Sequence, residues 1–363
     1  MFPNLQEKDQ LLGLAVAIKG WAMELGFQQL GIADVELYDD EKRLCAWLAA
    51  GQHGTMEYMA RHGTKRSRPK ELLPGTLRVL CVRMNYGGAT GTKPQQTLGD
   101  PGAAYVARYA VGRDYHKVLR TRLRQLVRRI QQHTHHFGYR IFVDSAPVLE
   151  KALARNAGLG WIGKHTNLIN RGDGSWFFLG EIFTDLPLPP DQPAQAYCGS
   201  CQACLNACPT KAIKAPYELD ARRCIAYLTI ELRSSIPVEL RPLMGNRIFG
   251  CDDCQLVCPW NRAAPPTLEA DFAPRHALDT RRLLELFHWS EEDFNLRTQG
   301  SPLRRIGYPC WLRNIAVALG NTPTSRAVVE ALEHAVDNPS ELVREHVRWA
   351  LSRHRAANTT DRP

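Results

Sequence analysis

The sequence predicts an α+β protein built from three consecutive parts, and three observations lead to this fold class. Short apolar runs alternate with helical stretches over residues 1–190, which predicts an α/β domain. Eight of the eleven cysteines lie within residues 198–258, which predicts a separate cysteine-rich domain over 191–265. Helical periodicity dominates residues 266–363 and predicts a helical domain. A chain of 363 residues is long enough for two or three domains of about 100–200 residues each.

The α/β domain begins with a predicted amphipathic helix. Leu11, Ile18 and Leu25 are among the apolar residues that recur at helical spacing over residues 7–26. Five strand-like apolar runs follow, at residues 77–84, 104–109, 139–143, 167–169 and 176–184. A proline-rich segment over 186–193 then predicts a linker into the cysteine-rich domain.

The cysteine-rich domain carries the clearest chemical signal. Its cysteines occur as Cys198-x2-Cys201-x2-Cys204-x3-Cys208-Pro209, then Cys224, then Cys251-x2-Cys254-x3-Cys258-Pro259. A C-x2-C-x2-C-x3-C-P run is typical of a bacterial [4Fe–4S] site, in which the last cysteine ligates the other cluster of a pair. The spacing therefore predicts two clusters, one held by Cys198, Cys201, Cys204 and Cys258 and the other by Cys208, Cys224, Cys251 and Cys254.

Two simpler interpretations of these cysteines are a zinc ribbon and a disulfide framework. A zinc ribbon uses four thiolates per ion and gives no role to the repeated Cys-Pro ending. Disulfides need an oxidising compartment, and the first ten residues show no signal peptide. The longest uncharged apolar run, residues 11–18, is too short for a membrane span of about 20 residues. We therefore expect a cytoplasmic protein, with Cys45, Cys81 and Cys310 as small buried hydrophobic residues.

The helical domain contains a possible internal repeat with a spacing of 32 residues, between segments 311–320 and 343–352. Ile315 aligns with Val347, and Ala318 aligns with Ala350. This pattern is typical of a HEAT-like repeat, which is too short here to fold without packing on the rest of the chain. Two amphipathic helices that are similar by chance remain the alternative.

Residues 158–165 contain a glycine-rich segment that resembles two nucleotide-binding motifs. Gly158, Gly160 and Gly163 match G-x-G-x-x-G, but the segment follows a helical stretch and not a strand. Lys164 is followed by His165, where a P-loop needs Ser or Thr. We therefore expect these glycines to form a turn in which the backbone approaches a bulky ligand.

The chain is basic, with 46 Lys and Arg against 37 Asp and Glu, and a net charge of +9. Seven cations and no carboxylate lie within residues 115–143, and the apolar residues between them predict one amphipathic helix. Two further basic clusters occur at residues 61–70 and 304–348. A run of charge is often only a solvated face, but solvated faces normally mix signs. The sequence therefore predicts binding to a phosphate backbone, with contacts from Arg120, Arg124 and Arg128.

Asp144 follows the predicted strand 139–143 and precedes a helix that Pro147 opens. In open α/β sheets, ligands bind beyond the carboxyl ends of the strands, which makes Asp144 a candidate site residue. The alternative is a carboxylate that only caps the following helix.

Three stretches of the chain together resemble the epoxyqueuosine reductase family. The first is VDSAPVLEK at 143–151 with AGLGWIGKH at 157–165, the second is RYAVGRDYH at 108–116, and the third is the eight-cysteine pattern. The resemblance covers essentially the whole chain. It implies an α/β cobalamin- and substrate-binding domain over 1–190, a ferredoxin-like two-cluster domain over 191–265 and a HEAT-like domain over 266–363.

The resemblance also implies an activity, namely reduction of epoxyqueuosine to queuosine at the wobble position of tRNA, with cobalamin and two [4Fe–4S] clusters as cofactors. The expected partners are a tRNA anticodon stem-loop and an external one-electron donor. Asp114-Tyr115-His116 begins the D-x-H-x-x-G motif of corrinoid proteins but lacks its glycine, so no histidine ligand to cobalt is expected from it. Cobalamin contacts are expected from Arg66, Asp144, Lys151, Leu168, Asp252 and Asp253.

Chemistry assigns further roles within this resemblance. Loss of the epoxide oxygen consumes two electrons and two protons, so one-electron clusters must feed a strongly reducing centre. We expect Asp144 to be the proton donor, with a pKa well above ~3.9 because burial disfavours its anion. The cluster that Cys254 helps to hold is expected nearer the corrin. The alternatives are a ferredoxin-like electron-transfer module, or a corrinoid reductive dehalogenase, which would usually carry a twin-arginine export signal.

Overall fold

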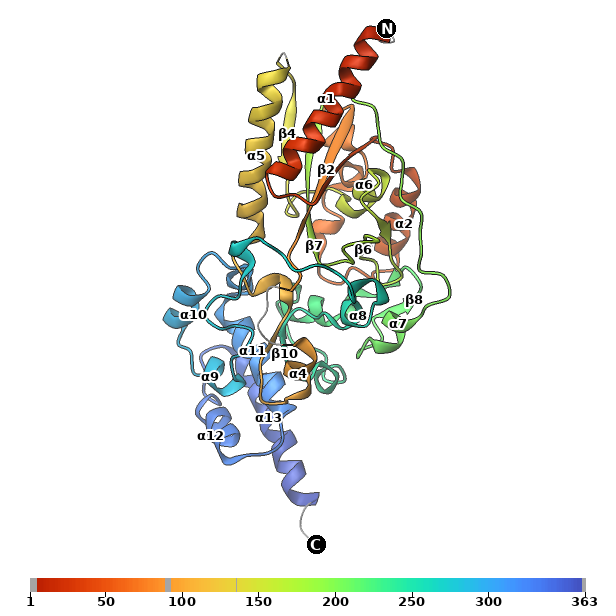
Figure 1. The fold of residues 1–363 in the computed structure, drawn as a ribbon. Helices are drawn as coiled ribbons and strands as arrows, with labels where there is room; N and C mark the ends of the chain where they lie inside the picture. Colours follow the sequence, from red (N-terminus) through yellow and green to blue (C-terminus); the bar gives the residue numbers. More distant parts are fainter. Residues whose placement is uncertain (1–4, 89–92, 135, 361–363) are drawn as a thin grey trace.

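The computed structural model describes residues 5–88, 93–134 and 136–360, and a four-stranded sheet forms the middle of the part that is uppermost in Figure 1. The strand order is β1-β2-β7-β4. Its strands are β1 (Gln29–Ala33), β2 (Arg78–Asn85), β4 (Tyr139–Phe142) and β7 (Phe177–Thr184). The apolar runs predict β2, β4 and β7, whereas the short β1, which lies directly after the first helix, is not predicted.

All three strand pairings in this sheet are antiparallel. The expectation of an α/β domain therefore needs correction, because strands that alternate with crossover helices pair in parallel. The observed arrangement is an antiparallel sheet covered by helices. The rule that places ligands beyond the carboxyl ends of parallel strands does not account for the position of Asp144 here.

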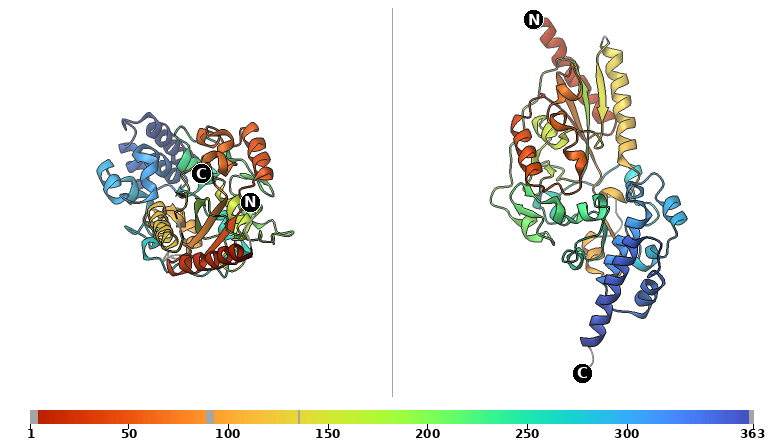
Figure 2. Two further views of the ribbon diagram at one scale, coloured as in Figure 1. Left: turned by 90° about the horizontal axis from the view of Figure 1, so that it is seen from above. Right: turned by 180° about the vertical axis from the view of Figure 1, so that it is seen from behind.

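Helices cover both faces of the sheet (Figure 2). Leu80 and Val82 of β2 face α1 (Leu5–Glu24) and α5 (Tyr115–His133) in one hydrophobic core. Val79 and Cys81 point to the opposite face, where α6 (Glu150–Asn156) packs. This alternation is the period of two that a strand imposes, and it lets one buried strand serve two cores.

The remaining elements surround this sheet and extend away from it. Along the sequence, the connections between the sheet strands also contain α2 (Tyr38–Ala49), α3 (Pro69–Leu72), α4 (Pro94–Gly99), β3 (Tyr105–Val106), β5 (Trp161–Ile162) and β6 (Leu168–Ile169). After the sheet come α7 (Ala203–Ala207), β8 (Ile213–Ala215), β9 (Glu218–Leu219), β10 (Arg247–Phe249), α8 (Asp253–Leu256), α9 (Leu283–Phe287), α10 (Glu291–Arg297), α11 (Gly307–Gly320), α12 (Arg326–His334) and α13 (Glu341–Thr360). Within the described ranges, none of these helices has the length and apolarity that crossing a membrane requires.

One segment of the N-terminal part belongs to the helical core instead of the sheet. β3 pairs in parallel with β10, and Ala104, Ala110 and Val111 are buried with residues of α9 and α11. The apolar run at 104–109 was expected in the α/β domain. This run is buried in the core of the C-terminal helices, so the chain passes from the sheet to the helical part and returns to the sheet before α5 begins.

The two segments of the possible repeat form helices that pack on each other. Ile315 in α11 and Val347 in α13 are fully buried in the same core. Ala318 and Ala350 are buried there too, each with at most 1% of its surface exposed. The aligned positions therefore face one interface. Arg313 belongs to the basic cluster expected at residues 304–348, but its side chain is fully buried. It donates hydrogen bonds to the backbone carbonyls of Leu228 and Leu232, so it is not a surface cation.

The glycine-rich turn packs against the chain itself. A Cβ at Gly160 would lie 2.1 Å from the carbonyl oxygen of Ile169, and one at Gly158 would lie 2.7 Å from that of Gln192. The expectation of a bulky ligand at this turn is therefore wrong, because backbone atoms occupy the space. The segment follows α6 and enters β5, which is not the context of a dinucleotide-binding or P-loop site.

Candidate active site

The two cysteine motifs repeat one local structure. Cys204 lies in α7 and Cys254 lies in α8, and each of these short helices contacts the other and is followed by a Cys-Pro pair. Cys208 and Cys258 have similar backbone angles, with φ −65° and ψ 112° against φ −67° and ψ 123°. Each Cys-Pro cysteine therefore leaves its helix in the same direction relative to that helix.

The structure brings the cysteines together in two groups. Cys258 packs with Cys198 and Trp161, and both Cys201 and Cys204 lie close enough to this pair to interact electrostatically with it. The other group lines a single cavity and consists of Cys208, Cys224, Cys251 and Cys254. In both groups the Cys-Pro cysteine of one motif joins the turn of the other. Of the three remaining cysteines, Cys81 and Cys310 are buried as expected, but Cys45 is exposed.

The chemistry of both groups suits iron–sulfur clusters. Burial raises the pKa of the Cys224, Cys251 and Cys254 thiols, so their thiolates need bound cations to be stable there. Among the described residues, no three His, Cys, Asp or Glu side chains converge on one single-ion site. A four-iron cube holds its thiolates farther apart than one zinc ion does, and soft thiolate sets favour iron–sulfur clusters.

Lys164 holds the cysteine turn of the first group in place through hydrogen bonds to its backbone. Its Nζ donates to the carbonyl oxygens of Gly199, at 2.6 Å, and Cys201, at 2.9 Å. The lysine itself is buried and follows β5, so it ties the cysteine turn to the sheet part. A P-loop lysine would instead reach out toward a phosphate.

A cavity of about 350 Å³ separates the second cysteine group from the sheet part. Its opposite wall is mainly apolar and includes Tyr86, Tyr109, Leu168, Phe177 and Leu179. A largely apolar cavity with a few polar groups is typical of a cofactor site. The buried Nε2 of His165, another lining residue, has no hydrogen-bond partner among the described residues. These features fit a large, mostly apolar cofactor that lies beside the second cysteine group.

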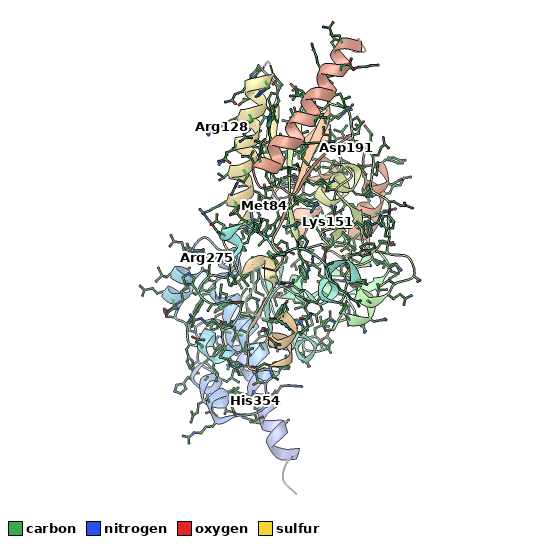
Figure 3. The ribbon with its side chains drawn as sticks, viewed as in Figure 1. Met84, Arg128, Lys151, Asp191, Arg275 and His354 are labelled. Carbon is green, nitrogen blue, oxygen red and sulfur yellow. The ribbon has the colours of Figure 1, made fainter. Side chains whose placement is uncertain are left out.

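The residues expected to contact the cofactor divide into three sets. Lys151 and Leu168 line the cavity, and Figure 3 shows Lys151 near the middle of the molecule. Asp252 and Asp253 also line it, but their carboxylates bind the chain: Asp252 accepts from Tyr105 and from the backbone N–H of Arg108, and Asp253 pairs with Arg247. Arg66 and Asp144 do not line the cavity.

Asp144 belongs to a hydrogen-bonded group beside this cavity. Its carboxylate accepts from the Tyr115 hydroxyl and lies 3.2 Å from Nε2 of His116. Nδ1 of His116 lies 2.9 Å from Asp114, which also caps α5. The ring of Tyr115 meets that of Tyr109, a cavity residue, edge-on with centroids 6.2 Å apart. The Asp144 carboxylate also interacts electrostatically with two residues that line the cavity, Tyr109 and Lys151. Carboxylates engage both nitrogens of His116.

The charge state of this group differs from the expectation. Burial pushes the pKa of Asp144 upward, but the hydrogen bonds from His116 and Tyr115 outweigh it and the pKa is lowered. Conversely, burial alone would lower the pKa of His116, yet Asp114 and Asp144 raise it. The expected raised pKa of Asp144 is therefore wrong, and the available proton resides on His116.

Two carboxyl groups that sequence reasoning missed lie behind Asp144. Glu150 accepts a hydrogen bond from the backbone N–H of Asp144, and Glu181 of β7 is fully buried nearby. Burial and the neighbouring Asp144 raise the pKa of Glu150 to about 7. Burial and Glu150 raise the pKa of Glu181 well above its usual range. An ionisable residue in the middle of the apolar run 176–184 is the sequence signal that could have identified Glu181.

The basic face of α5 is narrower than the sequence predicts. Arg124 and Arg128 are exposed, and Arg120 is partly exposed and donates to Ser145 Oγ at 2.8 Å. Figure 3 shows Arg128 at the outer side of this helix. Two other arginines of the helix turn inward to ion pairs, Arg122 with Glu269 and Arg129 with Glu24. In the second basic cluster, Arg66 is buried and Arg68 pairs with Glu41.

The cavity has buried thiols on one wall and an acid–base group behind the other wall. This arrangement is suited to electron transfer that is coupled to proton transfer. Iron–sulfur oxidoreductases are the class of protein that combines these two functions. Two family models match the same regions. The model for epoxyqueuosine reductase QueG, DUF1730, matches residues 66–145, and that for a 4Fe-4S double cluster binding domain matches residues 197–261.

Relatives with known names extend this similarity to nearly the whole chain. The epoxyqueuosine reductase of Pseudomonas aeruginosa is 63% identical over 342 residues, which are 94% of each chain. That of Escherichia coli K12 is 57% identical over 348 residues, 96% of this chain and 91% of the relative. The chain therefore belongs to the epoxyqueuosine reductase family, and it is an oxidoreductase.

Solved structures of the same family share the fold. An epoxyqueuosine reductase from Bacillus subtilis, described with its catalytic aspartate loop swung out of the active site, superposes with a TM-score of 0.87 at 27% identity, covering 95% of this chain and 91% of that one. A second structure, of an epoxyqueuosine reductase with a tRNA-Tyr epoxyqueuosine-modified stem loop, gives a TM-score of 0.86 at 27% identity over the same shares.

Proposed function

We propose that this protein reduces epoxyqueuosine to queuosine at the wobble position of tRNA, with cobalamin and two [4Fe–4S] clusters as cofactors. The single observation that carries the proposal is the cavity with the second cysteine group on one wall and the Asp144 group beside the other. The relative solved with an epoxyqueuosine-modified stem loop supports the substrate. A tRNA substrate is the reason for assigning the reaction to the cytoplasm.

The cofactor assignments follow from the donor sets. Cys198, Cys201, Cys204 and Cys258 hold one cluster, and Cys208, Cys224, Cys251 and Cys254 hold the one beside the cavity. Bound cobalamin supplies a strongly reducing centre there. Lys151 and Leu168 contact it from the sheet side. Both nitrogens of His116 are engaged by carboxylates, which supports binding without a histidine ligand from that motif.

The protein's own contribution to the reaction is proton delivery. The epoxide takes up two electrons and two protons, its oxygen leaves as water, and a C=C bond forms. An oxygen that leaves carbon as an unprotonated alkoxide is a poor species to form, so a positioned acid accelerates this step. His116 carries the proton and passes it across 3.2 Å to Asp144, which is ionised at rest and delivers the proton to the oxygen. The described loop aspartate of the Bacillus subtilis relative supports this role for a loop residue such as Asp144.

The three parts of the chain divide this work. Residues 1–190 bind cobalamin and substrate, 191–265 form the ferredoxin-like part, and 266–363 form a HEAT-like part to which β3 and its neighbours contribute. The first cysteine group receives electrons from an external one-electron donor, because Cys201 is exposed whereas the second group lines the cavity. The outer face of α5 holds the anticodon stem-loop by its phosphates.

Neutralising this outer face is expected to weaken tRNA binding. In the triple variant Arg120→Gln, Arg124→Gln, Arg128→Gln, the slope of log affinity against log salt should flatten by about 0.7–0.9 per lost phosphate contact, or about 2–3 in all. Filter binding across a salt series measures it. Arg129→Gln is the matched control, because this arginine of the same helix pairs with Glu24 of α1, and its loss should leave the slope unchanged. An unchanged slope in the triple variant would assign binding to another surface.

An anaerobic assay tests the proposed function as a whole. Purified protein with about eight iron atoms per chain, added cobalamin and a chemical reductant should convert epoxyqueuosine in tRNA to queuosine, as detected by nucleoside mass spectrometry. Cobalamin should also change its visible spectrum on binding. Conversion that does not depend on cobalamin would refute the cofactor assignment. A spectrum that cobalamin leaves unchanged, together with no conversion, would favour an electron-transfer module instead.

A further inference from the structure

Asp144 has a backbone conformation that other contacts must maintain. Its φ is +56°, in the left-handed region that residues other than glycine adopt uncommonly. It lies in the short segment between β4 and α6, where Ser145 donates its N–H to the carbonyl of Val143 at 2.6 Å. Tyr115 and His116 contact only the side chain of Asp144. The bond between Ser145 and Val143 closes the turn around Asp144, and a contact from outside the loop would fix this turn relative to the sheet.

Glu150 makes that contact. Its Oε1 accepts the backbone N–H of Asp144, six residues earlier in the chain. Glu150 is the first residue of α6, and Ala152, Leu153 and Ala154 of this helix are buried against the sheet, so the acceptor is attached to a rigid element. The hydrogen bond thus ties the segment that carries Asp144 to the core.

The environment of Glu150 makes this contact sensitive to protonation. Glu181 is fully buried next to Glu150, close enough for the two carboxyl groups to share a hydrogen bond. Two adjacent buried carboxylates repel each other, so one proton is retained by the pair. A charged Glu150 is a stronger acceptor than a neutral one, because hydrogen bonds to ionised groups are shorter and stronger.

We propose that Glu150 is the positioning residue of Asp144, holding the backbone of the loop in the catalytic conformation through its carboxylate. The inference rests on the proposed function only in naming Asp144 as the proton donor, since the contact itself is independent of the substrate. It gives Glu150 a role in the reaction although it touches neither substrate nor cofactor.

Several charged and titratable groups face Glu150. They are Asp144 on the loop, Tyr115 and His116 on α5, Lys151 on α6, Glu181 on β7, Cys81 on β2, and Arg66 from the segment before α3. His116 is the one whose ordinary pKa also lies close to neutral pH, and its protonation has the opposite effect on the loop. Protonation of His116 strengthens its hold on the Asp144 carboxylate, whereas protonation of Glu150 weakens the hold on the Asp144 backbone.

Hydrogen exchange of the loop tests the proposal directly. In the cluster-loaded protein, Glu150→Ala should accelerate exchange in peptides that span residues 143–149 by about tenfold, the effect of one lost hydrogen bond. Glu150→Gln keeps a neutral acceptor and should stay within about threefold of wild type. Glu291→Ala is the matched control, because it removes a first-turn carboxylate from α10 without touching the loop. Single-turnover reduction should fall in Glu150→Ala and largely recover in Glu150→Gln.

The pH profile gives a second readout, which a merely structural role would not change. Because the pKa of Glu150 is raised to about 7, the carboxylate is charged above this pH and neutral below it. After correction for intrinsic exchange, protection of the loop in wild type should therefore decrease as pH falls through about 7. The glutamine of Glu150→Gln does not ionise, so in this variant the decrease in protection should be absent.

The outcomes separate this proposal from the proposed function. Equal exchange of the loop in wild type and Glu150→Ala would overturn the positioning role, as would an identical pH profile in wild type and Glu150→Gln. If Glu150→Ala does not fold, the pH comparison with Glu150→Gln still decides. A wild-type protein that shows the expected exchange but does not reduce epoxyqueuosine would refute the proposed function and leave the role of Glu150 in holding the loop.

Discussion

Asp144→Asn is expected to lower the single-turnover rate of epoxyqueuosine reduction by about 10²–10⁴-fold, the usual contribution of a positioned general acid. Asn has nearly the same shape and retains a hydrogen-bond acceptor, so both clusters, cobalamin binding and tRNA affinity should be unchanged. The loss should be confined to the chemical step. Rapid-quench measurements on anaerobic protein that is saturated with modified tRNA would show it.

The charge distribution around Asp144 predicts how the wild-type rate depends on pH. Because Asp114 and Asp144 raise the pKa of His116, the imidazolium persists to higher pH than in an ordinary histidine. The proton supply is therefore present below that pKa, and the rate should fall as pH rises through it. His116→Gln should remove this limb. A rate for Asp144→Asn within about threefold of wild type would show that another group delivers the proton.

Cys254→Ala is expected to remove the cluster beside the cavity and abolish turnover, because electrons then have no carrier between the first cluster and the cofactor. Iron should fall from about eight to about four atoms per chain. Cys208→Ala should give the same spectroscopic result although Cys208 belongs to the other sequence motif, since both line the cavity. Iron analysis with electron paramagnetic resonance of the reduced protein distinguishes the remaining cluster.

Two other variants provide the comparison. Cys201→Ala and Cys258→Ala should both damage the other cluster and leave the one beside the cavity. Cys45→Ala, which changes an exposed cysteine outside both groups, should retain full iron content and activity. If Cys208→Ala resembles Cys201→Ala instead of Cys254→Ala, each motif holds its own cluster and the exchange of the Cys-Pro cysteines is wrong.

Local spacing explains why the cysteines could be read from the sequence. A C-x2-C-x2-C turn is short and its geometry is determined within one motif, so ligand type and grouping follow from the pattern. The apolar face of α5 is similarly local, and Leu119, Leu123 and Ile130 are all fully buried as the helical period predicts. Long apolar strands such as β2 and β7 were predicted because each is buried on both faces.

The iron–sulfur motifs, the long strands and the main helices could thus be predicted from the chain alone, because each depends on residues close together in the sequence, whereas cobalamin was expected only from the family resemblance. The antiparallel pairing of the sheet, the burial of Arg313 and the charge state of Asp144 are apparent only in the folded structure. Asp144 meets His116 and Glu181 from elements far away in sequence, and their hydrogen bonds and burial oppose each other. Which of two opposing effects on a pKa prevails depends on distances that no spacing in the chain encodes.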